Sequence, residues 1–198
     1  MLIVIEGCVG VGKSTVARGL AGLRGGDVLL ENFESNPFLR DFSRDPVANA
    51  LETEFAFLLL HFHQTKNISV TEDSQTIADF HLGKDLLYAD LNLSDVRAKR
   101  IFTELYDLCS SRTPAPSLMI CLSATTDLVL QRIRLRNRDF ELELDADYYT
   151  RLNGAYEDFF AQYRGKKLRV NMDAWDFIKD HQLYERLSAL VDQELNTK

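Results

Sequence analysis

The chain has 198 residues, 45% of them hydrophobic and 27% charged, which is ordinary for a water-soluble globular protein and enough for one α/β domain. Thirty acidic residues against 23 Lys and Arg give a formal net charge of −7, which argues against general binding to nucleic acid or to an anionic membrane. Three widely spaced cysteines without a C-x-x-C pair indicate reduced thiols in a cytoplasmic protein, with neither a disulfide nor a zinc site.

The first predicted element is a buried strand over the apolar run 2–6, which leaves no room for a signal peptide before it. Residues 7–14, GCVGVGKS, then fit the pattern G-x-x-x-x-G-K-[ST] at every specified position, and helical periodicity follows over 13–23. A strand, a glycine loop and a helix N-terminus form a concavity of backbone N–H groups that binds nucleotide phosphates. We expect Lys13 to reach the β- and γ-phosphate oxygens and the Ser14 hydroxyl to ligate Mg²⁺.

Strand and helix patterns alternate along the rest of the chain. Apolar strand candidates recur at 27–31, 75–79, 117–122 and 167–171, and helical periodicity covers 46–67, 84–109, 126–136, 146–163 and 180–195. This alternation predicts an α/β fold, with one domain over residues 1–198 and a five-stranded parallel sheet that carries helices on both faces. Ligands of such sheets bind at the carboxyl ends of the strands.

Two carboxylates follow predicted strands at that edge. Glu31 ends the second strand candidate, where it could take the proton of an attacking hydroxyl, although a solvated loop acid or a helix cap explains its position equally well. Asp79 ends the third candidate and is the expected second oxygen ligand of Mg²⁺, with a cap of the following helix as the alternative.

The helix predicted over 46–67 is apolar on nearly all sides, so we expect it to be buried by the core or by a partner subunit. Glu54 and His61 lie two turns apart on one face of this helix. Buried polar side chains need partners. These two either find partners within the core or face a polar ligand, and we favour the ligand.

Four arginines gather in one segment of this otherwise acidic chain: Arg132, Arg134, Arg136 and Arg138. They form either a solvated helix face or a mobile lid that stabilises the charge of a transferring phosphoryl group. We favour the lid, because Arg132 and Arg136 share a helix face at i, i+4. After the last strand, Trp175 and Phe177 either stack on a nucleotide base or fill the core.

Together these motifs resemble the deoxynucleoside kinase family, and in particular its bacterial deoxyadenosine and deoxyguanosine kinases. The similarity extends over nearly the whole chain, and four of its motifs are I-E-G-x-x-G-x-G-K-S-T at 5–15, N-P-F-L at 36–39, R-I-x-x-R-x-R-x-x-E at 132–141 and D-F at 176–177. The resemblance implies a P-loop kinase fold with an arginine-bearing lid at about 132–144. It also implies ATP as phosphate donor, Mg²⁺ as cofactor, and a homodimer that binds neither nucleic acid nor membrane.

The resemblance further implies a role for each site residue. The implied catalytic residues are Glu31 as general base, Lys13, Arg132, Arg136 and Arg138. The implied ATP-binding residues are Gly7, Gly10, Gly12, Lys13, Ser14, Thr15, Arg132, Asp176 and Phe177, with Ser14 and Asp79 on the metal. The implied substrate-binding residues are Glu31, Glu54, His61, Tyr88 stacked on the base, and Glu141 on the sugar 3′-hydroxyl.

The chain departs from the family pattern at three places. Phe80 stands where the family has the arginine of D-R-S, so we expect a lid arginine to take over its contacts. Glu54 and His61 stand where Gln and Arg are usual, and an ionised Glu54 would accept hydrogen bonds only, which favours a base edge that presents N–H groups. The segment between Asp79 and Tyr88 is one residue short, which leaves open whether Lys84 or Asp85 faces the base.

The expected activity is ATP-dependent phosphorylation of the 5′-hydroxyl of a deoxynucleoside, with a purine base favoured. One alternative is a nucleoside monophosphate kinase resembling thymidylate kinase. Such an enzyme needs extra cations for the acceptor phosphate, and the 30–45 region supplies only Arg40 and Arg44. The other alternative is a nucleotide-binding regulatory module without catalysis, which only the loss of the arginine at Phe80 supports.

Overall fold

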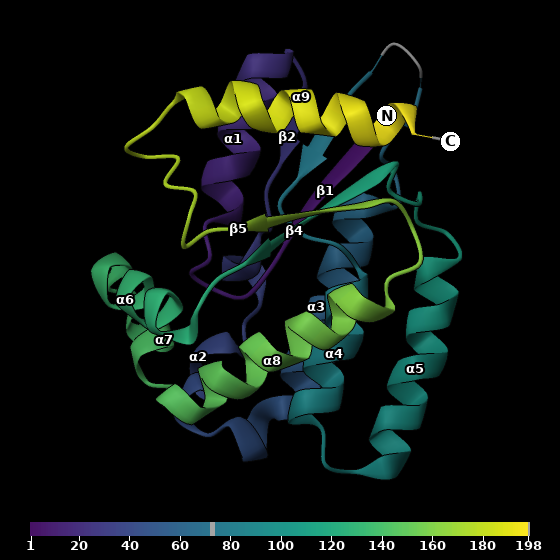
Figure 1. Cartoon of the computed structure of the whole chain (residues 1–198). Helices are drawn as coiled ribbons and strands as arrows, with labels where there is room; N and C mark the ends of the chain where they lie inside the picture. The colour runs from purple at the N-terminus through teal and green to yellow at the C-terminus, as the bar shows by residue number, and fades with distance from the viewer. Residues whose placement is uncertain (72–73, 198) are drawn as a thin grey trace.

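Five parallel strands form the central sheet, in the order β2-β3-β1-β4-β5 (Figure 1). The computed structural model describes residues 1–71 and 74–197. The strands are β1 (Leu2–Glu6), β2 (Asp27–Leu29), β3 (Thr76–Ala78), β4 (Leu118–Ser123) and β5 (Lys167–Asn171). The predicted parallel sheet is confirmed. Strand β2 ends earlier than predicted because the backbone N–H of Glu31 binds the Asp79 side chain instead of continuing the ladder.

Helices cover both faces of this sheet, as predicted (Figure 1). The longer helices are α1 (Lys13–Arg24), α3 (Pro46–Thr65), α4 (Gly83–Asn92), α5 (Val96–Ser110), α6 (Thr126–Arg136), α8 (Ala146–Gln162) and α9 (Gln182–Asn196). Three short helices were not predicted: η1 (Phe33–Ser35), α2 (Leu39–Arg44) and α7 (Asp139–Leu142). These have too few residues for a periodic pattern to reveal them.

Strand β4 shows why the sheet has two cores. Ile120 and Leu122 point to the face covered by α1 and α9, and Met119 and Cys121 point to the face covered by α3, α5 and α8. Side chains of a strand alternate between faces, and a strand buried on both sides must therefore be apolar throughout.

The prediction of one helix over 84–109 was wrong, since α4 ends at Asn92 and α5 begins at Val96. Leu93 has an extended backbone, and the Asp95 side chain accepts a hydrogen bond of 2.7 Å from the N–H of Ala98. An aspartate in this position caps a new helix and competes with continuation of the old one. The break lets α4 and α5 run in different directions (Figure 1).

Helix α3 is only partly buried within this chain. Glu54, Leu58 and His61 are 2% exposed or less, whereas Leu51 and Leu59 are each 51% exposed. The core therefore covers one side of the helix and leaves an apolar strip on the other.

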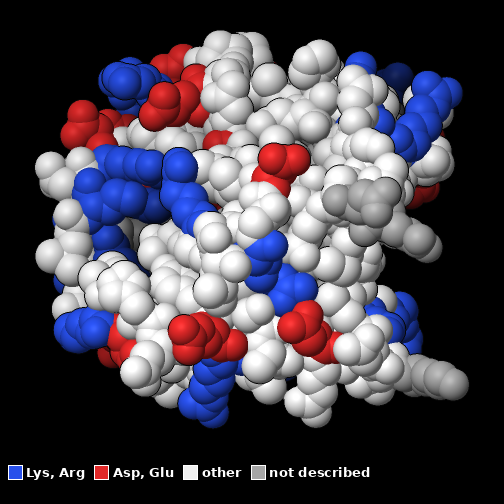
Figure 2. Space-filling view, turned by 90° about the horizontal axis from the view of Figure 1, so that it is seen from above, with Lys and Arg blue, Asp and Glu red and all other residues white. Residues whose placement is uncertain are grey.

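The surface carries charges of both signs among many uncharged residues on the side of α9 (Figure 2). None of the helices in the described part of the chain combines the length and the apolar character that crossing a membrane requires.

Replacing Asp95 by Ala is expected to lower the free energy of unfolding by about 1 kcal/mol, because α5 loses its N-terminal cap. Asp107→Ala, an exposed position within the same helix, is the matched control and should leave stability nearly unchanged. Urea denaturation measures both variants. Equal stability of the two would show that Asp95 does not separate α4 from α5.

Candidate active site

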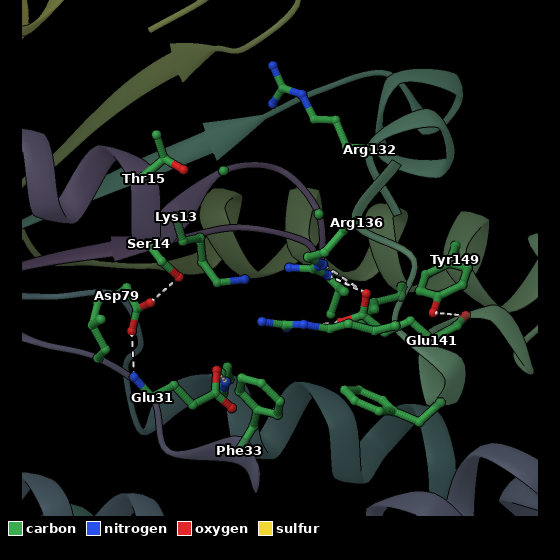
Figure 3. A pocket seen from close by; sticks show the side chains of 18 of the residues that line it. Lys13, Ser14, Thr15, Glu31, Phe33, Asp79, Arg132, Arg136, Glu141 and Tyr149 are labelled. Carbon is green, nitrogen blue, oxygen red and sulfur yellow. Dashed lines mark hydrogen bonds and ion pairs between the residues drawn. The ribbon is translucent and has the colours of Figure 1, made fainter. Parts of the chain in front are cut away.

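A cavity of about 700 Å³ lies at the carboxyl edge of the sheet. Every residue predicted for the site lines it except Gly7, the buried first residue of the glycine loop. Residues from widely separated parts of the chain thus meet in one space, and in Figure 3 the side chains of Lys13 and Glu31 converge there. The volume is in the range that holds a small organic ligand.

The glycine loop ends at α1 in a backbone conformation that side chains resist. Gly10 has φ 82° and Gly12 has φ 114°, both in the left-handed region that favours glycine. A Cβ on Gly10 would lie 2.9 Å from the Ile133 side chain, so a larger residue would also collide with α6. The loop therefore keeps its backbone close to the cavity, with the N-terminus of α1 behind it.

Two cations lie against this loop. The Lys13 ammonium donates to the carbonyl oxygens of Gly7 at 2.6 Å and of Cys8 at 3.3 Å. From α6, Arg132 donates to the carbonyl oxygen of Val11 at 2.5 Å. Positive charge thus flanks the loop from two elements, which suits a polyphosphate.

Asp79 connects the loop to the end of the neighbouring strand. One carboxylate oxygen accepts from the Ser14 hydroxyl at 2.5 Å, and the other accepts from the backbone N–H of Glu31 at 2.7 Å (Figure 3). Asp79 does not cap α4, because the N–H of Gly83 binds the His81 ring instead. A hydroxyl beside a carboxylate at a phosphate loop is the oxygen donor set that Mg²⁺ prefers, so these residues fit that ion.

Glu31 is not a solvated loop acid, because cations hold both of its carboxylate oxygens. Oε2 lies 2.6 Å from the Lys84 ammonium, and Oε1 lies 3.2 Å from Nε2 of His61. Burial alone would raise the pKa of Glu31, but Lys84 and His61 outweigh it and hold that pKa well below its usual range. Glu31 is therefore an ionised hydrogen-bond acceptor inside the cavity.

His61 is held between two carboxylates. Its Nδ1 lies 2.7 Å from Asp85 and its other ring nitrogen contacts Glu31. Burial disfavours the imidazolium, yet these carboxylates outweigh it and raise the pKa of His61 to about 9. The second oxygen of Asp85 is buried without a hydrogen-bond partner among the described residues, although Asp85 lines the cavity.

Glu54 and His61 do not pair with each other. The Glu54 carboxylate accepts from the Asn92 amide at 2.7 Å, and burial raises its pKa to about 8. The condition under which Glu54 would only accept hydrogen bonds, an ionised carboxylate, is therefore not met at neutral pH. Its protonated form can donate a hydrogen bond as well as accept one.

The predicted lid segment contains α7 and the turn that follows α6. Arg136 binds the Glu141 carboxylate at 2.6 Å and Arg138 lies 3.4 Å from its other oxygen, while Arg134 is exposed. Arg138 also lies over the Phe33 ring, 4.5 Å from its centroid, so the segment reaches across to η1. Of the four arginines, Arg132, Arg136 and Arg138 line the cavity and Arg134 is on the outside.

The segment after β5 favours the core interpretation for its aromatic residues. Phe177 is 3% exposed and packs on Tyr184 with ring centroids 4.8 Å apart, next to Trp175. The Asp176 carboxylate accepts hydrogen bonds from the N–H groups of Ile178 and Lys179, which fixes the turn that borders the cavity.

The sequence left open whether Lys84 or Asp85, both in α4, faces the site. Both Lys84 and Asp85 line the cavity, Lys84 at Glu31 and Asp85 at His61. The cation near Phe80 is therefore Lys84 and not the expected lid arginine. The spacing contained a signal for both, because positions 84 and 85 precede Tyr88 by four and three residues on a helix and share its face. Further aromatic residues that line the cavity were missed as well, among them Phe33, Phe57 and Phe140.

Comparisons with known proteins point to one family. A sequence model for deoxynucleoside kinases matches residues 3–196. The deoxyguanosine kinase of Bacillus subtilis (strain 168) is 29% identical over 199 residues, which cover 96% of each chain. The deoxyadenosine kinase of Lactobacillus acidophilus is 27% identical and covers 98% of this chain and 96% of its own. A solved structure of deoxyadenosine kinase from M. mycoides, with dCMP and dCDP bound, shares the fold with a TM-score of 0.82. The two sequences are 23% identical, and the match covers 96% of this chain and 100% of that one.

The imidazole of His61 is expected to remain charged at neutral pH and to titrate at about 9. Because its pKa is raised on folding, its stabilisation is fully present below the unfolded value of about 6.5 and is lost as the pH rises through about 9. An NMR titration of the ring nitrogens measures this, with the exposed His63 of the same helix as internal reference. A neutral His61 ring at pH 7 would contradict the ion pairs with Asp85 and Glu31.

Proposed function

This chain belongs to the deoxynucleoside kinase family, and we propose that it transfers the γ-phosphate of ATP to the 5′-hydroxyl of a deoxynucleoside. One observation carries the proposal. The phosphate loop with Lys13 and the ionised carboxylate of Glu31 face each other across one cavity, so that a donor phosphate and an acceptor hydroxyl can meet between them. Relatives aligned over nearly the whole chain are named for deoxyguanosine and deoxyadenosine, which supports a purine acceptor.

On the donor side, the N–H groups of the loop and the Lys13 ammonium bind the phosphates of ATP. The loop residues with this role are Gly7, Gly10, Gly12, Ser14 and Thr15. Ser14 and Asp79 would hold Mg²⁺, which supplies charge neutralisation between the β- and γ-phosphates when bound. Asp176 and Phe177 border the space next to the loop, where the adenine of ATP would lie.

On the acceptor side, Glu31 accepts the proton of the 5′-hydroxyl as that oxygen attacks the γ-phosphate. Arg132, Arg136 and Arg138 stabilise the charge on the transferring group from the lid, residues 132–144 of a single domain. Glu141 accepts from the sugar 3′-hydroxyl, and its two arginine partners keep its carboxylate oriented.

The base of the acceptor occupies the part of the cavity between α3 and α4. Tyr88 and Phe57 offer aromatic surfaces there, and Glu54, His61 and Asp85 offer polar atoms. A neutral Glu54 both donates and accepts, and one Asp85 oxygen has no hydrogen-bond partner among the described residues. This part of the site can therefore match a base edge that carries a donor next to an acceptor.

The cations of the cavity favour a nucleoside acceptor over a nucleoside monophosphate. On the acceptor side, Lys84 already pairs with the Glu31 carboxylate. Neither Arg40 nor Arg44 is among the described residues that line the cavity. The regulatory alternative rests on Phe80, and Lys84 supplies a cation beside it. The three cysteines are buried free thiols, which suits the reducing cytoplasm where we place the enzyme.

We also propose that the protein is a homodimer through α3 and α5. A shallow apolar groove lies between these helices, and its lining includes Val47, Leu51 and Ile101. These side chains are 86%, 51% and 42% exposed, a contiguous apolar surface of the kind that subunits bury.

Replacing Glu31 by Gln is expected to lower kcat by roughly 10²–10⁴-fold, because the general base is lost, while ATP binding persists. The assay follows ADP release with Mg²⁺ and each of the four deoxynucleosides. Glu34→Gln, an exposed acid of the same segment, should retain wild-type activity. Turnover with a nucleoside monophosphate and with no nucleoside would contradict the proposed activity.

Replacing Leu51 by Glu is expected to convert the dimer into a monomer, since a charge would be buried without a partner in the interface. Sedimentation velocity measures the change. Leu23→Glu, on α1 and 48% exposed, is the matched control and should remain dimeric. A monomeric wild-type protein, or a dimeric Leu51→Glu variant, would refute an interface through α3.

A further inference from the structure

Lys84 is a buried cation that no role in the family pattern accounts for. It lies in the first turn of α4 and is 6% exposed. Its ammonium is 2.6 Å from Oε2 of Glu31 and 5.9 Å from the centroid of the Phe80 ring. Burying an ammonium costs free energy unless the charge is paired. The ion pair with Glu31 is therefore the principal contact that keeps the charged Lys84 at this buried position.

The carboxylate of Glu31 is fixed from two helices at once. Lys84 of α4 holds Oε2, and His61 of α3 holds Oε1, with the ring of His61 held in turn by Asp85. Asp79 binds the backbone N–H of Glu31 from the end of β3. Each carboxylate oxygen keeps a further lone pair, so an acceptor hydroxyl can still bind while the carboxylate is held in place.

Phe80 explains why the holding cation comes from α4. Its ring is fully buried and lies 5.0 Å from the His61 ring and beneath Lys84, where an aromatic face favours a nearby cation. Phe80 is not among the described residues that line the cavity, and its ring has no donor for Glu31. Lys84 reaches over this ring to the carboxylate.

The surrounding charges support a fixed ammonium at this place. Burial disfavours the charged form, but Glu31, Glu6 and Asp85 outweigh it and raise the pKa of Lys84. Lys13 and His61 are the other cations whose charge acts on Glu31, and Lys13 instead bonds the carbonyl oxygens of the phosphate loop.

We propose that Lys84 is a positioning residue, which orients the Glu31 carboxylate toward the acceptor hydroxyl. The proposal rests on the proposed kinase activity, with Glu31 as the base. Because Lys84 acts through Glu31 and not on the donor, its removal should impair the chemical step and leave ATP binding intact. A lysine that merely supports the fold would lower the amount of folded enzyme but not the kcat of the folded fraction.

The test is a double-mutant cycle between Lys84→Met and Glu31→Gln, with kcat and the two KM values measured for each variant. Lys84→Met should lower kcat on the order of 10²-fold, the scale of a misplaced reacting group, with KM for ATP unchanged. Lys84→Arg should restore most of kcat, because it keeps a donor and a positive charge. In the Glu31→Gln background, Lys84→Met should cost nothing further, since no carboxylate remains to be positioned.

Several results would overturn the proposal. These are an unchanged kcat in Lys84→Met, or an equal loss of kcat in both Glu31 backgrounds. If Lys84→Met does not fold, Lys84→Gln takes its place in the cycle. A kcat of Lys84→Gln equal to that of Lys84→Arg would contradict a role for the charge. The activity of the wild type distinguishes failure of the kinase proposal from failure of the role of Lys84. A wild type without turnover on any deoxynucleoside refutes the kinase proposal itself. An active wild type with an equally active Lys84→Met refutes only the role of Lys84.

Discussion

The Asp79 carboxylate accepts one hydrogen bond from the Ser14 hydroxyl and another from the backbone N–H of Glu31. These contacts join the phosphate loop at the end of β1 to the segment at the end of β2, with β3 between them. Because β3 lies between the other two strands, Asp79, the residue that follows β3, can reach both neighbours. The distance between the donor and acceptor halves of the site is therefore set by the spacing of three parallel strands, and the rest of the cavity is built around it.

The second constraint is charge burial at that edge. Glu31, Lys84, His61 and Asp85 are all poorly accessible, and each is held by at least one opposite charge. Charges in low dielectric are tolerated only when paired, and removal of one partner leaves the other unpaired. The network therefore fixes the carboxylate of Glu31 and keeps it ionised. Glu54 lacks such an ion pair among the described residues, and its pKa rises to about 8.

The two cores hold these groups in place. Strand β4 presents Ile120 to one face and Met119 to the other, so that helices pack on both sides of the same strand. The packing of α3 and α4 on the second face brings His61 to Asp85, 24 residues away in sequence. On its outer side α3 leaves Leu51 and Leu59 half exposed, so the helix that holds the site together also carries an exposed apolar surface.

The sequence by itself determined the parts that depend on neighbouring residues. Residues 7–14 specify the phosphate loop because its function needs only a local backbone shape, and the apolar runs place Glu31 and Asp79 at the edge of the sheet. The tertiary structure alone decided which groups pair. The helical periodicity of the sequence does not reveal the cap at Asp95, which separates α4 from α5. It also does not predict that Lys84 reaches Glu31. The protonation of Glu54 likewise depends on burial and on partners from other helices, which no local pattern contains.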